Sequence, residues 1–121
     1  MTIETIQLGD VATARSGDQG NHANIGVVAF TRAGFEFLAR ELTTQRVSEH
    51  FGGLGASRVE RFELPNVWAL NFLLYDALGG GASRSVRVDT QGKLLGTAAL
   101  AIELPRPDNL QQMTRILHSS F

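Results

Sequence analysis

Hydrophobic and polar positions alternate over the first third of the chain, which predicts β-strands. The alternation runs from Thr2 to Ala14, with a bulge expected at Gly9, and resumes from Asn24 to Thr31, where β-branched and aromatic residues are frequent. The segment from Ser16 to His22 between them is polar and glycine-rich. It interrupts the apolar pattern, so we expect it to form the loop between two strands.

The next segment changes to helical spacing. Arg32–Phe51 is predicted to be helical, in two pieces broken near Thr43 and Thr44, and to end at Gly52 and Gly53. The apolar positions that recur three and four residues apart in its first half are Phe35, Leu38, Ala39 and Leu42.

A strand is expected over Ser57–Leu64, stopped by Pro65, and then a helix from Asn66 to Leu78. Only Asn71 and Asp76 interrupt the hydrophobicity of that second helix, so it has almost no polar face. Two interpretations stay open: neighbouring helices cover its flanks, or its aromatic residues lie in a subunit interface. The aromatic residues concerned are Trp68, Phe72 and Tyr75.

Alternation returns in the last third. Strands are predicted over Arg84–Val88 and Leu94–Leu104, joined by a hairpin loop at 89–93. The tail carries apolar residues at helical spacing, which favours a short amphipathic helix. These tail residues are Leu110, Met113, Ile116 and Leu117.

The predicted order of elements is therefore β-β-α-β-α-β-β-α. It indicates an α+β sandwich with a mixed or antiparallel sheet and helices on one face. A right-handed crossover from Ser57–Leu64 to Arg84–Val88 is expected if those two strands are parallel. We divide the chain into one domain over residues 1–104 and a tail over residues 105–121.

Composition narrows the function classes. A chain of 121 residues with 43% hydrophobic and 19% charged residues is one ordinary globular domain. Its net charge of −1 gives no field that would attract nucleic acid or a membrane surface, and no apolar run reaches the length of a spanning helix. There is no cysteine and no segment that resembles a signal peptide. We therefore expect a cytoplasmic protein without disulfides, nucleic-acid partners or membrane segments.

About half of the 13 glycines are expected to end helices or form turns, among them Gly52, Gly53, Gly55, Gly92 and Gly96. Most of the others concentrate in two polar loops that are candidates for a ligand site. Glycine lets a ligand approach the backbone amides closely, although both loops could also be ordinary turns. In the first loop the candidate residues are Ser16, Gly17, Asp18, Gly20, Asn21 and Asn24. In the second they are Gly80, Gly81, Ser83, Arg84 and Ser85, whose hydroxyls and guanidinium suit a phosphate or carboxylate. Whether the two loops converge is left open.

The sequence contains no strong candidate for a set of catalytic residues. His22, His50 and His118 lack the spacing of metal ligands, so no metal and no cofactor is expected. A triad of Ser16, His22 and Asp18 would place three neighbours on one loop, where relay geometry is rare. Asp18 is the one candidate general base.

Three motifs resemble the small domain that accompanies acyclic-terpene-utilisation proteins of AtuA type. They are Val11-Ala12-Thr13-Ala14-Arg15-Ser16-Gly17-Asp18 with Gly20-Asn21 and Ala23-Asn24-Ile25-Gly26-Val27; Glu63-Leu64-Pro65-Asn66 with Ala69-Leu70-Asn71-Phe72; and Ala77-Leu78-Gly79-Gly80-Gly81-Ala82-Ser83-Arg84-Ser85. The resemblance covers about Ile6 to Leu104 and implies a ferredoxin-like α+β fold. It also adds Asn71 to the candidate ligand-binding residues. The family usually has lysine where this chain has Gln19, which removes a cation from the first loop.

The resemblance implies a companion role. The expected function is a small subunit beside a large AtuA-type protein in bacterial acyl-CoA or terpenoid catabolism, with its glycine-rich loops contributing to a shared site for an anionic metabolite. Two alternatives remain: a homo-oligomeric lyase- or hydratase-like enzyme with Asp18 as base and Arg84 as anion clamp, and a homo-oligomer that binds a ligand without catalysis.

Overall fold

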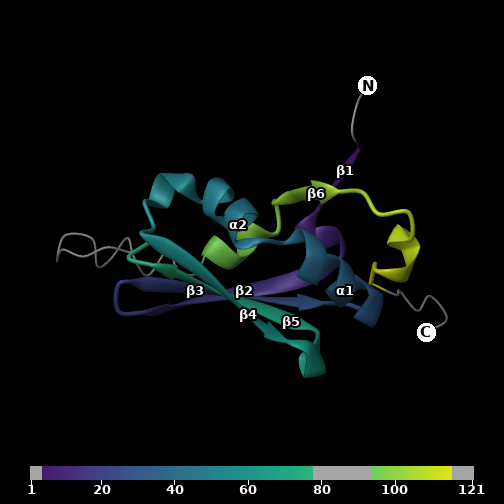
Figure 1. Cartoon of the computed structure of the whole chain (residues 1–121), viewed down its shortest axis with the longest axis horizontal. Coiled ribbons are helices and arrows are strands. Elements are labelled where there is room, and N and C mark those ends of the chain that lie inside the picture. The colour runs from purple at the N-terminus through teal and green to yellow at the C-terminus, as the bar shows by residue number, and fades with distance from the viewer. Residues whose placement is uncertain (1–3, 78–93, 116–121) are drawn as a thin grey trace.

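A four-stranded antiparallel sheet forms the centre of the computed structural model, which describes residues 4–77 and 94–115. The strands lie in the order β2 (Ala12–Gln19), β3 (His22–Ala29), β5 (Ala69–Tyr75) and β4 (Arg58–Leu64). Each neighbouring pair is antiparallel, and the helices pack above one face of this sheet (Figure 1). The predicted α+β class with helices on one face is confirmed.

The two-piece helix is also confirmed. Helix α1 spans Arg32–Glu41 and helix α2 spans Thr44–His50. Thr31 caps the first by accepting a hydrogen bond from the amide of Gly34, and Thr43 caps the second in the same way. A threonine that caps a new helix cannot also continue the previous one, which explains the break. The 3-10 turn Gly52–Leu54 follows α2.

The core lies between the helices and one face of the sheet. Leu70, Phe72 and Leu74 of β5 point into it, and Phe72 and Leu74 are completely buried. They pack with apolar residues from β3, α1 and α2. The principal partners are Ile25, Val27, Phe37, Leu38 and Val47.

The helix predicted from Asn66 to Leu78 is wrong, because this segment is strand β5 after a 3-10 turn at Pro65–Val67. β5 lies between β3 and β4, so neither of its edges is exposed to solvent, and its outward side chains are half-buried as well. A strand in that position carries apolar residues on both faces. β4 (predicted over Ser57–Leu64) is confirmed, but β4 and β5 are antiparallel neighbours, so no helical crossover leaves β4.

The strand predicted over Leu94–Leu104 is also wrong for most of its length. Residues 94–99 are helical, and only β6 (Glu103–Pro105) is extended. The buried positions Leu95, Ala99 and Ile102 follow helical spacing, four and three residues apart, and alanine-rich sequence favours a helix. The predicted strand Arg84–Val88 and its hairpin loop lie outside the described residues.

A second, two-stranded sheet brings the first strand of the described chain beside the last. β1 (Thr5–Gln7) pairs with β6 in antiparallel register, Ile6 opposite Leu104. A 3-10 turn at Leu8–Asp10 separates β1 from β2, where the sequence analysis expected one strand with a bulge at Gly9. The cause is a capping interaction, since the carboxylate of Asp10 accepts a hydrogen bond from the amide of Gln7.

The tail packs against the domain. Instead of the predicted helix, its described part contains the 3-10 turn Leu110–Gln112, and Met113 is buried in the core. The hydroxyl of Thr31 donates to the carbonyl of Gln112, which ties the tail to the start of α1. Ile116 and Leu117 lie outside the described residues. The division into 1–104 and 105–121 stays a prediction.

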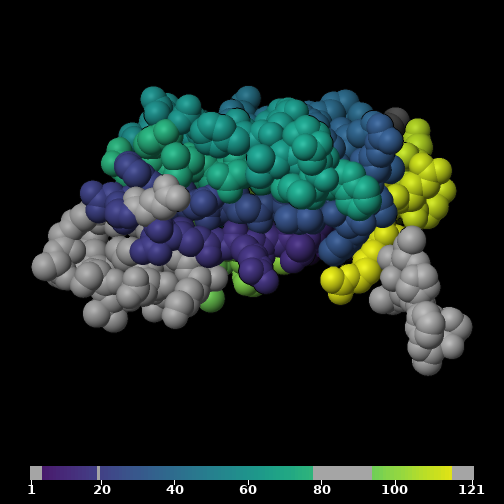
Figure 2. All heavy atoms as spheres, turned by 90° about the horizontal axis from the view of Figure 1, so that it is seen from below, coloured from purple at the N-terminus to yellow at the C-terminus, as the bar shows by residue number. Residues whose placement is uncertain are grey.

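The sheet face away from the helices, called the outer face below, is formed by every second residue of the four strands. The pairing register places these side chains in rows across the sheet. One row holds Arg15, Gly26, Asn71 and Phe62, and the next holds Gly17, Asn24, Leu73 and Glu60. Thr13, Val28, Ala69 and Leu64 form the row on one side of these two. Figure 2 views the molecule from below and shows the four strands side by side, with β4 and β5 followed by β3 and then β2.

Candidate functional site

The first glycine-rich segment is the tip of the β2–β3 hairpin rather than a long loop. Gln19 pairs with His22, so the connection consists of Gly20 and Asn21 alone. Gly20 has φ +65, a conformation that L side chains rarely adopt and that the first position of a type II′ turn requires. Asp18, Gly20 and Asn21 are exposed, and a Cβ atom added at Gly20 would meet no atom within 4 Å.

Because the predicted loop residues belong to strands, their side chains alternate between the two faces of the sheet. Ser16 and Asp18 are on the helix side, whereas Gly17 and Asn24 are on the outer face, where Asn71 joins them from β5. The structure therefore divides the candidate residues into a helix-side pair, the two turn residues and an outer-face group. It also separates Ser16 from His22, so these residues cannot act as a triad.

Ser16 holds the helix at 94–99 against the hairpin. Its hydroxyl oxygen accepts a hydrogen bond from the amide of Gly96 at 2.9 Å. Gly96 itself lies so close to β2 that a Cβ atom there would be 3.1 Å from backbone atoms of Arg15 and Ser16. The absence of a side chain at Gly96 permits this close packing, and the hydroxyl group of Ser16 satisfies an amide in the first turn of the helix.

On β3, the other strand of the hairpin, His22 accepts a hydrogen bond from the residue that follows β5. The amide of Asp76 donates to Nδ1 of His22 at 2.9 Å, so the neutral ring carries its proton on Nε2. Asp76 has φ +60, and its carboxylate accepts a hydrogen bond from the hydroxyl of Ser57 at 2.6 Å. His22 also contacts the ring of Tyr75 edge-on. No local sequence pattern predicts this group, because its members lie far apart in the chain.

A charged cluster continues from Tyr75 onto β4. Arg58 lies over the ring of Tyr75, 4.1 Å from its centre, and the hydroxyl of Tyr75 donates to Glu60. Hydrogen bonding with Tyr75, and then the charge of Glu60, raises the pKa of the Arg58 guanidinium above its ordinary value. Arg58 therefore carries a positive charge at neutral pH, as guanidinium groups in proteins do.

Two residues, one on either side of the second glycine-rich segment, contact the β2–β3 hairpin. Asp76 lies just before that segment and bonds His22 beside the turn, while Gly96 lies eleven residues after Ser85 and bonds Ser16 farther along β2. The candidate residues Gly80, Gly81, Ser83, Arg84 and Ser85 lie outside the described residues.

Within the described residues, two polar groups of the outer face have no partner. Oδ1 of Asn24 is buried and accepts no hydrogen bond there, and the exposed guanidinium of Arg15 forms no ion pair. Gly17 and Gly26 lie in the same two rows, so the surface between these polar groups carries no side chains at two positions. Arg15 and Gly26 belong to the first motif but were not chosen as site residues.

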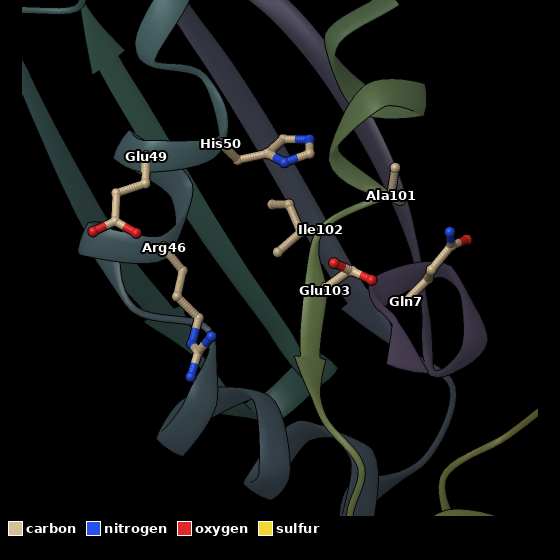
Figure 3. A pocket seen from close by; sticks show the side chains of 7 residues that line it. All are labelled: Gln7, Arg46, Glu49, His50, Ala101, Ile102 and Glu103. Carbon is tan, nitrogen blue, oxygen red and sulfur yellow. The ribbon is translucent and has the colours of Figure 1, made fainter. Parts of the chain in front are cut away.

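The surface pockets lined by described residues lie away from these candidate residues. The one in Figure 3 has a volume of about 400 Å³ and lies between α2, β6 and the start of the chain. Its polar side chains do not converge: His50 points toward the 94–101 segment, where its Nε2 bonds the carbonyl of Ala98, and the carboxylate of Glu49 lies on the other side of α2. This arrangement does not form a reaction centre. Among the described residues no group of three or more His, Asp or Glu could hold a metal ion.

The architecture defines the class: a small α+β domain with an antiparallel sheet covered by helices on one face. The family model of the AtuA ferredoxin-like domain matches residues 6–105, and the chain belongs to that family. Searches of curated proteins and of solved structures found no significant match. No helix within the described ranges is long and apolar enough to cross a membrane.

Proposed function

We propose that this chain is a small companion subunit of a large AtuA-type protein in acyl-CoA or terpenoid catabolism, and that the hairpin tip contributes to a site for an anionic metabolite shared by the two proteins. One observation carries the proposal. Asp76, before the second glycine-rich segment, bonds His22, and Gly96, after it, bonds Ser16, so the described residues on either side of that segment contact the β2–β3 hairpin.

The chemistry of the tip supports binding rather than self-contained catalysis. Gly17 and Gly20 leave backbone open to a ligand, since a Cβ atom at either position would meet nothing within 4 Å. The exposed Asn21 adds an amide donor. Asp18 has no hydrogen-bond or ion-pair partner in the described chain that would orient it as a base. A site of this kind needs further groups, and a partner would supply them.

Co-expression with a large AtuA-type protein from the same genome tests the companion role. The expected result is a stable complex of the two chains on size-exclusion chromatography with light scattering. A complex that binds a coenzyme A thioester in calorimetry, when this chain alone does not, supports the shared site. If no complex forms at any salt concentration, the companion role is wrong; activity of the isolated chain that is lost in Asp18→Asn then favours the enzyme alternative.

Asn21→Ala tests the hairpin tip within that complex. Because Asn21 is an exposed turn residue, the variant is expected to fold and assemble normally but to bind the thioester about tenfold more weakly, the effect of one lost hydrogen bond to a charged group. The matched control is Asn66→Ala, an exposed asparagine in the turn before β5, at the opposite end of the sheet. Equal affinity in the two variants would exclude the tip from the site.

A further inference from the structure

The outer face carries exposed apolar side chains beside its unpartnered polar groups. Val28, Phe62 and Leu64 are 41%, 46% and 49% exposed, and the register places them in two adjoining rows. Single exposed apolar residues are common on protein surfaces, but several large ones in adjoining rows of one sheet face mark a contact surface. The described helices pack on the opposite side of the sheet and leave this face open.

The two edges of this face have complementary chemistry at the same level of the sheet. On the β2 edge, Arg15 is exposed and without an ion pair in the described chain. On the β4 edge, Phe62 lies in the same row as Arg15, and Glu60 lies in the next. Three strand spacings of about 4.8 Å separate the two edges, so Arg15 cannot reach Phe62 or Glu60 within one chain.

We propose that the outer face is the contact between two copies of this chain, related by a two-fold axis that runs along the strands. Such an axis keeps each row at its level and exchanges β2 with β4. It therefore sets Arg15 over the ring of the partner's Phe62 and beside the carboxylate of the partner's Glu60, which in its own chain also pairs with Arg58. Two twisted sheets that pack face to face in this way form a standard sandwich arrangement.

The same axis brings the centres of the two faces together. It passes between β3 and β5, so Asn24 faces the partner's Leu73. At the β2 edge of the same row, a Cβ atom on Gly17 would meet nothing within 4 Å, so the partner's β4 can approach closely there. A self-complementary face of this kind is what a two-fold contact requires.

The size of the face indicates a reversible dimer. Four strands about 4.8 Å apart, with outward residues about 6.8 Å apart along each, give a face of roughly 19 by 24 Å. Two such faces bury on the order of 1,000 Å², near the lower limit of specific interfaces. We expect a dissociation constant in the micromolar range. Gly20 and Asn21 of the hairpin tip lie beyond these rows and Asp18 lies on the other face of the sheet, so these three residues stay accessible in the dimer, whereas Gly17 becomes covered. The dimer does not depend on the proposed function.

Sedimentation equilibrium of the purified chain, over a concentration range about the micromolar level, tests the dimer. Leu64→Glu places a charge on the outer face at a position that is already half exposed, so it should fold and raise the dissociation constant at least about tenfold. The matched control is Leu94→Glu, because Leu94 is 57% exposed and lies on the helix at 94–99, away from this face. It should dimerise like the unaltered chain.

A charge exchange tests the orientation. Arg15→Glu and Glu60→Arg should each weaken the dimer, and the double variant should recover most of the affinity, because the two residues meet only between copies. Circular dichroism shows that each variant is folded. A chain that stays monomeric throughout, or a dimer that Leu94→Glu disrupts and Leu64→Glu does not, overturns the proposal. So does a monomer that uses Leu64 to bind a large AtuA-type protein, a result that would leave the companion role standing.

Discussion

Gly96 shows how one missing side chain positions a whole element. The helix at 94–99 approaches β2 at this residue more closely than a Cβ atom allows, and Ser16 satisfies its amide there. In the sequence, Gly96 looked like an ordinary turn glycine. Only the three-dimensional neighbours, which are backbone atoms of a strand 80 residues earlier, explain why glycine stands at this position.

Gly96→Ala is therefore expected to destabilise the protein by about 1–3 kcal/mol, the usual cost of forcing one extra carbon into a packed contact. Backbone atoms of Arg15 and Ser16 cannot move aside as a flexible side chain would. Urea denaturation followed by circular dichroism measures the change. Gly53→Ala is the control, since a Cβ atom there meets nothing within 4 Å, and it should shift stability by less than about 0.5 kcal/mol. Equal stability of the two variants would contradict the close packing.

At the scale of elements, sequence patterns predicted those helices whose ends and buried faces depend on nearby residues. The spacing of apolar residues predicted the positions of α1 and α2, and the break was expected near Thr43 and Thr44, where the structure has Thr43 as the cap of α2. The prediction for β5 was wrong because a strand that lies between β3 and β4 is apolar on both faces, and a buried helix has the same pattern. The sequence alone does not show which strands flank it.

Two leucines of β5 distinguish the strand from the helix. In a helix, Leu70 and Leu73 would share a face, whereas in β5 Leu70 is 1% exposed in the core and Leu73 is half-buried on the outer face. Leu70→Ala should cost about 2–5 kcal/mol of unfolding free energy, and Leu73→Ala about 1 kcal/mol or less. Denaturation at submicromolar concentration keeps the proposed dimer from contributing. Similar losses for both variants would be the result expected of a helix.

At the scale of the molecule, the candidate residues are arranged differently from the sequence expectation, and their role in a ligand site stays a prediction. Among the residues from Ser16 to Asn24, His22 bonds Asp76 and Ser16 bonds Gly96. Their expected grouping in one loop was not found, because a two-residue turn makes most of them strand residues that alternate between faces. His22 and Asp76 come together only through the pairing of β3 with β5, a long-range contact that no local motif records.

The tail gives a final test of how far the folded unit extends. The family match ends at residue 105, yet Met113 is 3% exposed in the core and the carbonyl of Gln112 accepts a hydrogen bond from Thr31, the cap of α1. Residues 106–115 therefore complete the hydrophobic core of this chain. A chain truncated after Pro105 would lose both contacts.

Truncation after Pro105 should lower the free energy of unfolding by at least the cost of removing Met113, about 2–5 kcal/mol. Truncation after Arg115 keeps both contacts and serves as the matched control. Met113→Ala in the full chain separates the packing of this side chain from the rest of the tail, and should account for most of the loss. Thermal denaturation of the three variants at one protein concentration measures the differences. If the chain that ends at Pro105 melts at the same temperature as the chain that ends at Arg115, the tail is an appendage, and the folded unit ends where the family match ends.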